Sequence, residues 1–159
     1  MNFIGRFYLD CDGVMADFNR HFKKLTGYDP QEYEDKFGSG KFWKVVQNSG
    51  EFFYDLEMME DAQELYDAVK HLNPVILTGT PSHDEAIHQK VRWVRKIFGN
   101  NQIVICCKSK NKYHYCFEGD VLVDDFLKHS QKWIDAGGIF VHHTSAKESI
   151  QKLKDLNIL

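Results

Sequence analysis

Two aspartates stand one residue apart in the stretch RFYLDCDGVMADF, which covers residues 6–18. Asp10 and Asp12 follow a short apolar run whose composition is typical of a buried strand. Two carboxylates at the end of a buried strand repel each other and are poorly solvated. Their placement therefore indicates that positive groups gather beside them.

Polar residues also end other apolar runs of the chain. Asp10, Thr78 and the pair Asp124 and Asp125 each close a predicted strand at its carboxyl end. Because open α/β sheets bind ligands at the carboxyl ends of their strands, we expect these side chains to converge on one rim. Several carboxylates close together need a cation, and oxygen ligands of this kind suit Mg2+.

A Mg2+ site next to a hydroxyl and a lysine is suited to binding a phosphoryl group. Lysines are available in CKSKNKYHY, residues 107–115. With the phosphate charge offset, one aspartate can attack phosphorus and form an aspartyl phosphate. The second aspartate can protonate the leaving oxygen and then activate water.

The elements that must position these residues are five unbroken apolar runs. Unbroken rather than alternating apolarity is typical of strands buried on both faces, as in a parallel sheet. Helical patterns fall between the later runs, so the sequence predicts a doubly wound, five-stranded parallel α/β fold with right-handed crossovers. The predicted strands cover residues 6–10, 74–78, 102–106, 120–125 and 138–142, and the helical patterns cover 62–72, 87–98 and 150–156.

The ends of the predicted helices carry recognisable signals. Ser82 with Glu85, and Ser145 with Glu148, have the spacing of capping boxes. Gly99 stands where the second helix should end.

More than sixty residues separate Asp12 from the second predicted strand, which is far longer than a single crossover. This segment holds aromatic-rich helical pieces around GKFWKVVQNSGEFFYDLE. We interpret residues 15–56 as a small helical cap inserted after the first strand, over the carboxyl ends of the strands. Residues 1–14 and 57–159 would then form the catalytic core.

Composition excludes several classes of protein. The chain has 159 residues, a formal charge of −3 and 43% hydrophobic residues, which indicates one globular domain without the basic field needed to hold a nucleic acid polymer. No apolar run approaches the length of a membrane span, and no signal peptide pattern precedes the first strand. We therefore expect a cytoplasmic location and four free cysteines.

The chain resembles the haloacid-dehalogenase-like (HAD) phosphatase superfamily through DCDGV, VILTGT and DVLVDD, which appear in the family's order around a lysine-bearing segment. The resemblance implies a HAD-like Rossmannoid core with Asp10 as the nucleophile and Asp12 as the acid/base. It places Thr78 and the amide of Gly79 on the phosphate. It also implies that Mg2+ is held by Asp10, the carbonyl of Asp12, Asp125 directly and Asp124 through water.

A closer resemblance is to the 5'(3')-deoxyribonucleotidases. It is carried by DGVMADF at residues 12–18, by FW at residues 42–43 and by EFFYDLEMMEDAQELYDAV at residues 51–69. In that family, cap aromatics stack on the base of a deoxynucleoside monophosphate. Carried over, this implies a base pocket lined by Phe18, Phe42 and Trp43, with Phe52 or Phe53 as further candidates.

The sequence also departs from that family. Where its members often have Ser after the Thr of the second motif and Arg after the acidic pair, this chain has Gly79 and Phe126. The lysine segment is a couple of residues longer than the family pattern. We prefer Lys112 as the phosphate-binding lysine on its distance to Asp124, with Lys110 and Lys108 behind it.

The expected function is a Mg2+-dependent phosphomonoesterase that acts on (deoxy)ribonucleoside monophosphates through an aspartyl phosphate. The preferred base, the sugar, 5' against 3' phosphate and a possible homodimer stay open. One alternative keeps the chemistry but uses sugar phosphates or other small phosphoesters. Another is a non-enzymatic phosphoacceptor such as a receiver domain, or a binding module, although a receiver has its acidic pair first and no counterpart of Asp12.

Overall fold

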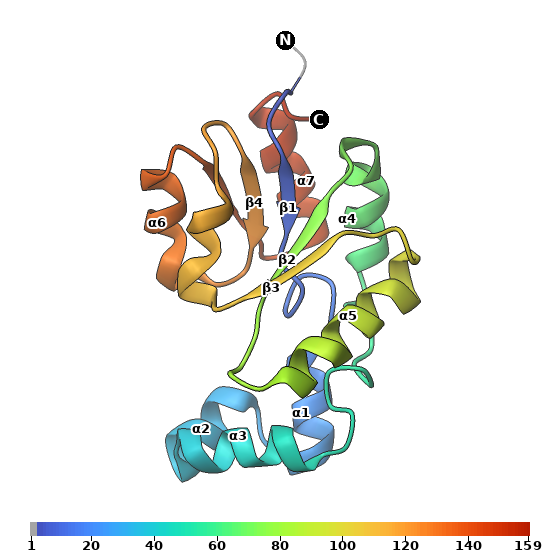
Figure 1. Ribbon diagram of the computed structural model, residues 1–159, viewed down its shortest axis with the longest axis vertical. Coiled ribbons are helices and arrows are strands. Elements are labelled where there is room, and N and C mark those ends of the chain that lie inside the picture. The colour runs from blue at the N-terminus through green and yellow to red at the C-terminus, as the bar shows by residue number, and fades with distance from the viewer. Residues whose placement is uncertain (1–2) are drawn as a thin grey trace.

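A computed structural model of the chain describes residues 3–159. Its centre is a five-stranded, all-parallel sheet with the strand order β3-β2-β1-β4-β5, which confirms the predicted fold class (Figure 1). Each predicted strand is present, with each bound within two residues of the prediction. The strands are β1 (Phe7–Leu9), β2 (Val75–Gly79), β3 (Val104–Cys107), β4 (Val121–Asp124) and β5 (Ile139–His142).

Helices cover both faces of this sheet (Figure 1). The α-helices are α1 (Phe18–Thr26), α2 (Pro30–Phe37), α3 (Ser39–Asn48), α4 (Ala62–Val69), α5 (Asp84–Phe98), α6 (Ser130–Asp135) and α7 (Ala146–Asp155). Among the described residues, the 3-10 segments are η1 (Lys70–Leu72), η2 (Ser109–Tyr115) and η3 (Leu127–His129).

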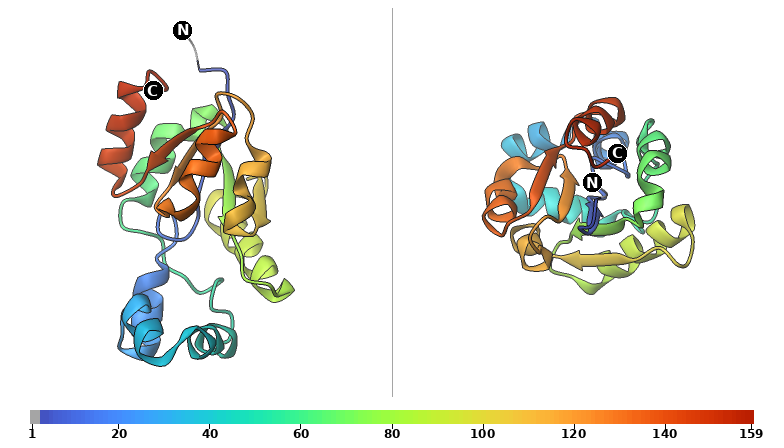
Figure 2. Two further views of the ribbon diagram at one scale, coloured as in Figure 1. Left: turned by 90° about the vertical axis from the view of Figure 1, so that its left-hand side faces the viewer. Right: turned by 90° about the horizontal axis from the view of Figure 1, so that it is seen from above.

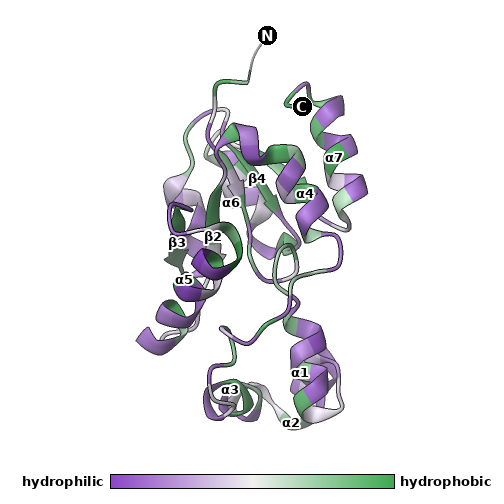
Figure 3. Ribbon diagram, turned by 90° about the vertical axis from the view of Figure 1, so that its right-hand side faces the viewer, coloured by the Kyte–Doolittle hydropathy of each residue, from purple (hydrophilic) through white to green (hydrophobic). Residues whose placement is uncertain are grey.

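Alternation along β1 explains why the sheet needs two apolar layers. Phe7 and Leu9 belong to the larger core cluster, to which α4, α5 and α7 contribute, whereas Tyr8 packs on the opposite face against Trp133 of α6. Successive strand residues point to opposite faces, so a strand covered on both sides reads as an unbroken apolar run. In Figure 3, β2 and β3 are accordingly coloured as hydrophobic over much of their length, whereas α5 is largely hydrophilic.

The segment predicted as a cap forms α1, α2 and α3. These helices gather at the carboxyl ends of the strands, away from the end of the sheet where both termini lie (Figures 1 and 2). Their interior is aromatic, with Phe22 stacked on Phe42 at a centroid distance of 4.8 Å. Helix α5 joins this group to the sheet, since Gln89 accepts a hydrogen bond from the Phe53 amide at 2.9 Å. The division into residues 15–56 and the remainder stays a prediction.

Of the three predicted helix-end signals, Gly99 is confirmed and the Ser145 capping box is present in one of its two hydrogen bonds. The Ser145 hydroxyl accepts a hydrogen bond from the Glu148 amide at the start of α7, and Gly99 ends α5 with a φ of 98°. The prediction of Ser82 as a cap is wrong. Helix α5 starts one residue later, and His83 Nδ1 accepts the hydrogen bond from the Ala86 amide. Within residues 3–159, no helix combines the length and apolarity needed to cross a bilayer.

Candidate active site

The loop after β1 brings the two aspartates together. The Asp10 amide donates to the Val123 carbonyl of β4 at 2.9 Å, which extends the ladder past the end of β1. The chain then turns sharply, and the Cys11 carbonyl accepts hydrogen bonds from the amides of Val14, Met15 and Ala16. This turn presents Asp10 and Asp12 at the rim of the sheet.

Gly13 is required in this turn for two reasons. Its φ is 82°, a conformation that L side chains rarely adopt. A Cβ at this position would also lie 2.1 Å from Oδ2 of Asp125. The glycine after the second aspartate therefore gives the Asp125 carboxylate the space to approach the β1 loop.

Three acids from two separate parts of the chain form a cluster at this rim. Carboxylate oxygens of Asp10, Asp124 and Asp125 lie within 4.8 Å of one another. Asp10 and Asp124 are buried and Asp125 is exposed, so the cluster is open on one side. An all-oxygen, open donor set of this kind fits a hard divalent cation that keeps part of its water shell.

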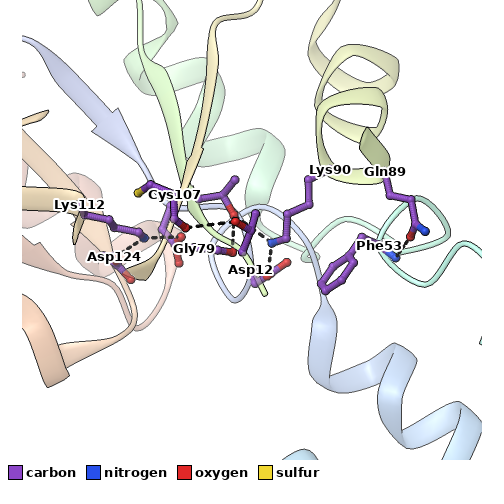
Figure 4. Close-up of polar contacts among 11 residues, drawn as sticks. Asp12, Phe53, Gly79, Gln89, Lys90, Cys107, Lys112 and Asp124 are labelled. Atoms are coloured by element: carbon purple, nitrogen blue, oxygen red, sulfur yellow. Dashed lines mark hydrogen bonds and ion pairs between the residues drawn. The ribbon is translucent and has the colours of Figure 1, made fainter. Parts of the chain in front are cut away.

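Lys112 is the lysine that the structure brings to this cluster. Its Nζ donates to Oδ1 of Asp10 at 2.7 Å. It also donates to Oδ2 of Asp124 at 2.8 Å (Figure 4). Lys112 is 7% exposed, although it lies in a polar segment where a lysine is usually solvated. Lys108 and Lys110 line the neighbouring cavity instead.

The three acids of the cluster differ in the direction in which their surroundings shift the pKa. Burial raises the pKa of Asp10, but the charges of Lys112 and Lys90 outweigh that effect and hold the pKa below its ordinary value. Burial, and next the negative charge of Asp10, raise the pKa of Asp124 to about 7 and that of Asp125 to about 8. Asp10 is therefore the acid that this environment keeps ionised.

A second buried lysine, Lys90 of α5, was missed from the sequence. It is 2% exposed, and its Nζ donates to Oδ2 of Asp12 at 2.5 Å and to the Thr78 hydroxyl at 3.0 Å (Figure 4). A signal for it existed, because position 90 falls on the same helix face as Ile87 and Val94, among the apolar positions. A lysine on the apolar face of a helix needs a buried acidic partner.

Asp12 is held by one oxygen and free at the other. Lys90 contacts Oδ2, whereas Oδ1 is buried and has no hydrogen-bond partner among residues 3–159. Burial raises the pKa of Asp12 above its ordinary value despite the opposing charge of Lys90. A carboxyl group in this state can hold and release a proton.

The two residues predicted to bind phosphate, Thr78 and Gly79, differ in whether they line a cavity. The Thr78 side chain is fully buried, and its hydroxyl is engaged by Lys90. Gly79 instead lines the cavity that also reaches Asp12. The cavity volume is about 690 Å3, which is within the range of small-molecule sites.

Aromatic side chains of α1, of α3 and of the segment after α3 also line this cavity. Phe18 and Trp43 line it, as does Phe53, whose ring lies 4.7 Å from Nζ of Lys90. Trp43 is 38% exposed, so part of its ring is available to a ligand. The structure does not bring Phe42 to the cavity, because its ring packs against Phe22 inside the helical insertion and is 7% exposed.

A comparison with protein families shows which family this chain belongs to. A family model described as 5' nucleotidase, deoxy (pyrimidine), cytosolic type C protein matches residues 4–151. The chain belongs to this family. The resemblance read from DCDGV, VILTGT and DVLVDD is thereby confirmed, and the chain is a HAD-type phosphatase. A comparison with curated protein sequences finds no match.

Solved structures agree on the fold. A HAD-superfamily hydrolase from Ehrlichia chaffeensis has 12% identity, with 99% of each chain covered and a TM-score of 0.59. A hydrolase from Streptococcus pneumoniae has 13% identity over 99% of this chain and 100% of that one, with a TM-score of 0.58. A HAD family hydrolase from Deinococcus radiodurans, solved with bound phosphate and sodium, has 12% identity over 88% and 80% of the two chains and a TM-score of 0.56.

Proposed function

We propose that this protein is a Mg2+-dependent phosphomonoesterase that hydrolyses nucleoside monophosphates, with deoxyribonucleotides as the preferred class. One observation supports the proposal: a single cavity is lined both by the carboxyl group of Asp12 with Gly79 and by the rings of Phe18 and Trp43. A ligand suited to it combines an anionic group with a flat apolar group. A nucleotide has both.

Asp10 is the proposed nucleophile. Lys112 fixes Oδ1 of Asp10, and the low pKa of this group keeps it ionised at neutral pH. Attack of an Asp10 oxygen on phosphorus forms an acyl phosphate while the P–O bond to the nucleoside breaks. Lys112 continues to offset negative charge at this centre.

Asp12 is the proposed proton carrier. It gives its proton to the leaving oxygen of the nucleoside and later takes one from the water that hydrolyses the acyl phosphate, which releases phosphate and ionised Asp10. The bond from Lys90 to Oδ2 fixes the carboxyl group through both steps. Lys90 is thus a positioning residue, since it acts through Asp12.

Asp10, Asp124 and Asp125 would hold Mg2+, with the carbonyl of Asp12 as a further ligand by resemblance. When bound, the ion supplies positive charge that offsets the phosphate oxygens and the carboxylates.

The test is phosphate release, with Mg2+ and with EDTA, from ribo- and deoxyribonucleoside 5'- and 3'-monophosphates, ribose 5-phosphate and p-nitrophenyl phosphate. The proposal expects Mg2+-dependent release that favours deoxynucleotides. Trp43→Ala should then raise KM for nucleotides about tenfold, since stacking on a base is worth roughly 1–3 kcal/mol. KM for ribose 5-phosphate should stay unchanged.

Leu25→Ala is the matched control, because Leu25 is an exposed apolar residue of the same helical insertion that lies outside this cavity. Preference for ribose 5-phosphate, unaffected by Trp43→Ala, would replace the nucleotide with a sugar phosphate. The absence of release from every substrate would contradict the proposed activity as a whole.

A further inference from the structure

At the end of β2, a residue from another segment of the chain occupies the space that a side chain at position 79 would take. Gly79 has no Cβ, and a Cβ built on its backbone would lie 2.0 Å from the hydroxyl oxygen of Ser109. The Ser109 hydroxyl therefore fills the space that a side chain at position 79 would take. The backbone of Gly79 does not explain the glycine, because its φ lies outside the positive range.

Ser109 and Lys112 reach the site from the same short element. Both belong to η2, a seven-residue 3-10 segment that directly follows the lysine after β3. In a 3-10 helix there are three residues per turn, so residues three apart lie one above the other on one face. The face of η2 that brings Lys112 onto Asp10 is therefore the face that brings Ser109 onto Gly79.

Ser109 borders the cavity in which the substrate is proposed to bind. Ser109 lines the cavity together with Asp12 and Gly79, and it is half-buried. Two threonines flank Gly79. Thr78 is fully buried and already contacts Lys90, and the Thr80 hydroxyl, in a residue that lines the same cavity, donates to the Cys107 carbonyl. Ser109 therefore supplies a further hydroxyl to the cavity wall beside Gly79.

We propose that Ser109 is a phosphate-binding residue whose hydroxyl, delivered by η2 across Gly79, donates a hydrogen bond to the phosphoryl oxygens of the substrate. The inference rests on the proposed phosphatase function and adds a residue to its phosphate site. Glycine at 79 and serine at 109 then form one unit: the first leaves the space that the second fills. Neither position should tolerate change alone.

Four variants distinguish two roles of the Ser109 hydroxyl: donating a hydrogen bond and filling the space beside Gly79. Ser109→Ala removes the oxygen, and Gly79→Ala places a Cβ against it. The double variant G79S/S109G returns a hydroxyl from the β2 side, whereas G79A/S109G restores the packing without the hydroxyl. The two double variants differ by one oxygen atom. Ser130→Ala is the matched control, because that hydroxyl donates to the Leu127 carbonyl outside the cavity.

The readouts are the inhibition constant of orthophosphate in p-nitrophenyl phosphate hydrolysis and the thermal shift caused by orthophosphate with Mg2+ present. A hydrogen bond to a charged group predicts about ten- to a hundredfold weaker phosphate binding in Ser109→Ala. G79S/S109G should bind phosphate within about threefold of wild type, while G79A/S109G stays as weak as Ser109→Ala, by the same hydrogen-bond reasoning. Ser130→Ala should match wild type.

Phosphate binding within twofold of wild type in Ser109→Ala would overturn the proposal, as would equal recovery in both double variants, which would make Ser109 a space-filling residue. If the double variants do not fold, Ser109→Thr decides: it keeps the hydroxyl and must bind phosphate better than Ser109→Ala. The thermal shift needs no turnover. Wild-type protein that binds orthophosphate but hydrolyses nothing would contradict the proposed function and leave this test intact.

Discussion

The acid cluster makes the metal-free protein sensitive to pH in a specific direction. The pKa of Asp124 is raised to about 7, so the folded state retains a proton that the unfolded chain has lost above the ordinary pKa of an aspartate. When the folded state binds more protons, stability falls as pH rises. In EDTA, we therefore expect the free energy of unfolding to decrease from pH 5 to pH 7.

The size of the effect follows from one proton. Each pH unit between the two pKa values costs about 1.4 kcal/mol, so two units cost roughly 2.7 kcal/mol. For a chain of this length, that corresponds to a decrease in Tm of about 5–11 °C. Asp125 is exposed, and solvent screening reduces its share.

A buried histidine changes the pH dependence of stability in the opposite direction, so the experiment must remove its contribution. Burial lowers the pKa of His143, so its contribution to stability increases with pH. Comparing wild type with Asp124→Asn removes this term, because both proteins contain His143. The assay is Tm in EDTA and in Mg2+ from pH 5 to pH 8.5, measured on both proteins.

The expected result is that wild type loses stability relative to Asp124→Asn as pH rises in EDTA. In Mg2+, ionised carboxylates become ligands, so the stabilisation by Mg2+ should grow with pH. A difference between the two proteins that does not change with pH would refute the raised pKa of Asp124. The absence of stabilisation by Mg2+ at pH 8 would refute the cluster as a metal site.

Three further changes test single contacts. Lys112→Met should lower kcat/KM by at least a hundredfold, as expected for loss of a buried charge beside the proposed nucleophile. Lys154→Met, at an exposed lysine of α7 outside the cavity, should change it less than threefold, and equal losses would contradict the assignment. Lys90→Met should shift the pH profile of kcat to higher pH, because Asp12 loses the cation that opposes its raised pKa. If stability falls but the pH profile does not change, Lys90 has only a structural role. Gly13→Ala should weaken Mg2+ binding about tenfold or more through the clash with Asp125. Its control, Gly38→Ala, has a similar φ of 86° with no atom within 4 Å, and an equal effect of both would reject the clash.

The sequence predicted the fold because its signals were local. Unbroken apolar runs located all five strands, and the acids at their ends converged because parallel strands share a carboxyl edge. Lys112 was preferred from its separation along the chain from Asp124, and the structure places its ammonium group on that carboxylate.

Contacts between distant segments were not accessible in the same way. Lys90 pairs with Asp12 across 78 positions, and only its place on an apolar helix face hinted at burial. Phe42 and Trp43 are adjacent, yet helical rotation turns the first into the aromatic interior and the second toward the cavity. The contact of Ser109 with Gly79 depends on the path of η2, which no sequence pattern specified.

The proposed mechanism requires that Asp10 becomes phosphorylated during turnover. Rapid quenching during hydrolysis of p-nitrophenyl phosphate, followed by borohydride reduction, converts an aspartyl phosphate to homoserine, which peptide mass spectrometry can locate. We predict homoserine at position 10 in the wild type, a larger fraction in Asp12→Asn, which lacks the base for the second step, and none in Asp10→Asn. Turnover without any modification at position 10, or wild-type rates in Asp10→Asn, would contradict the account.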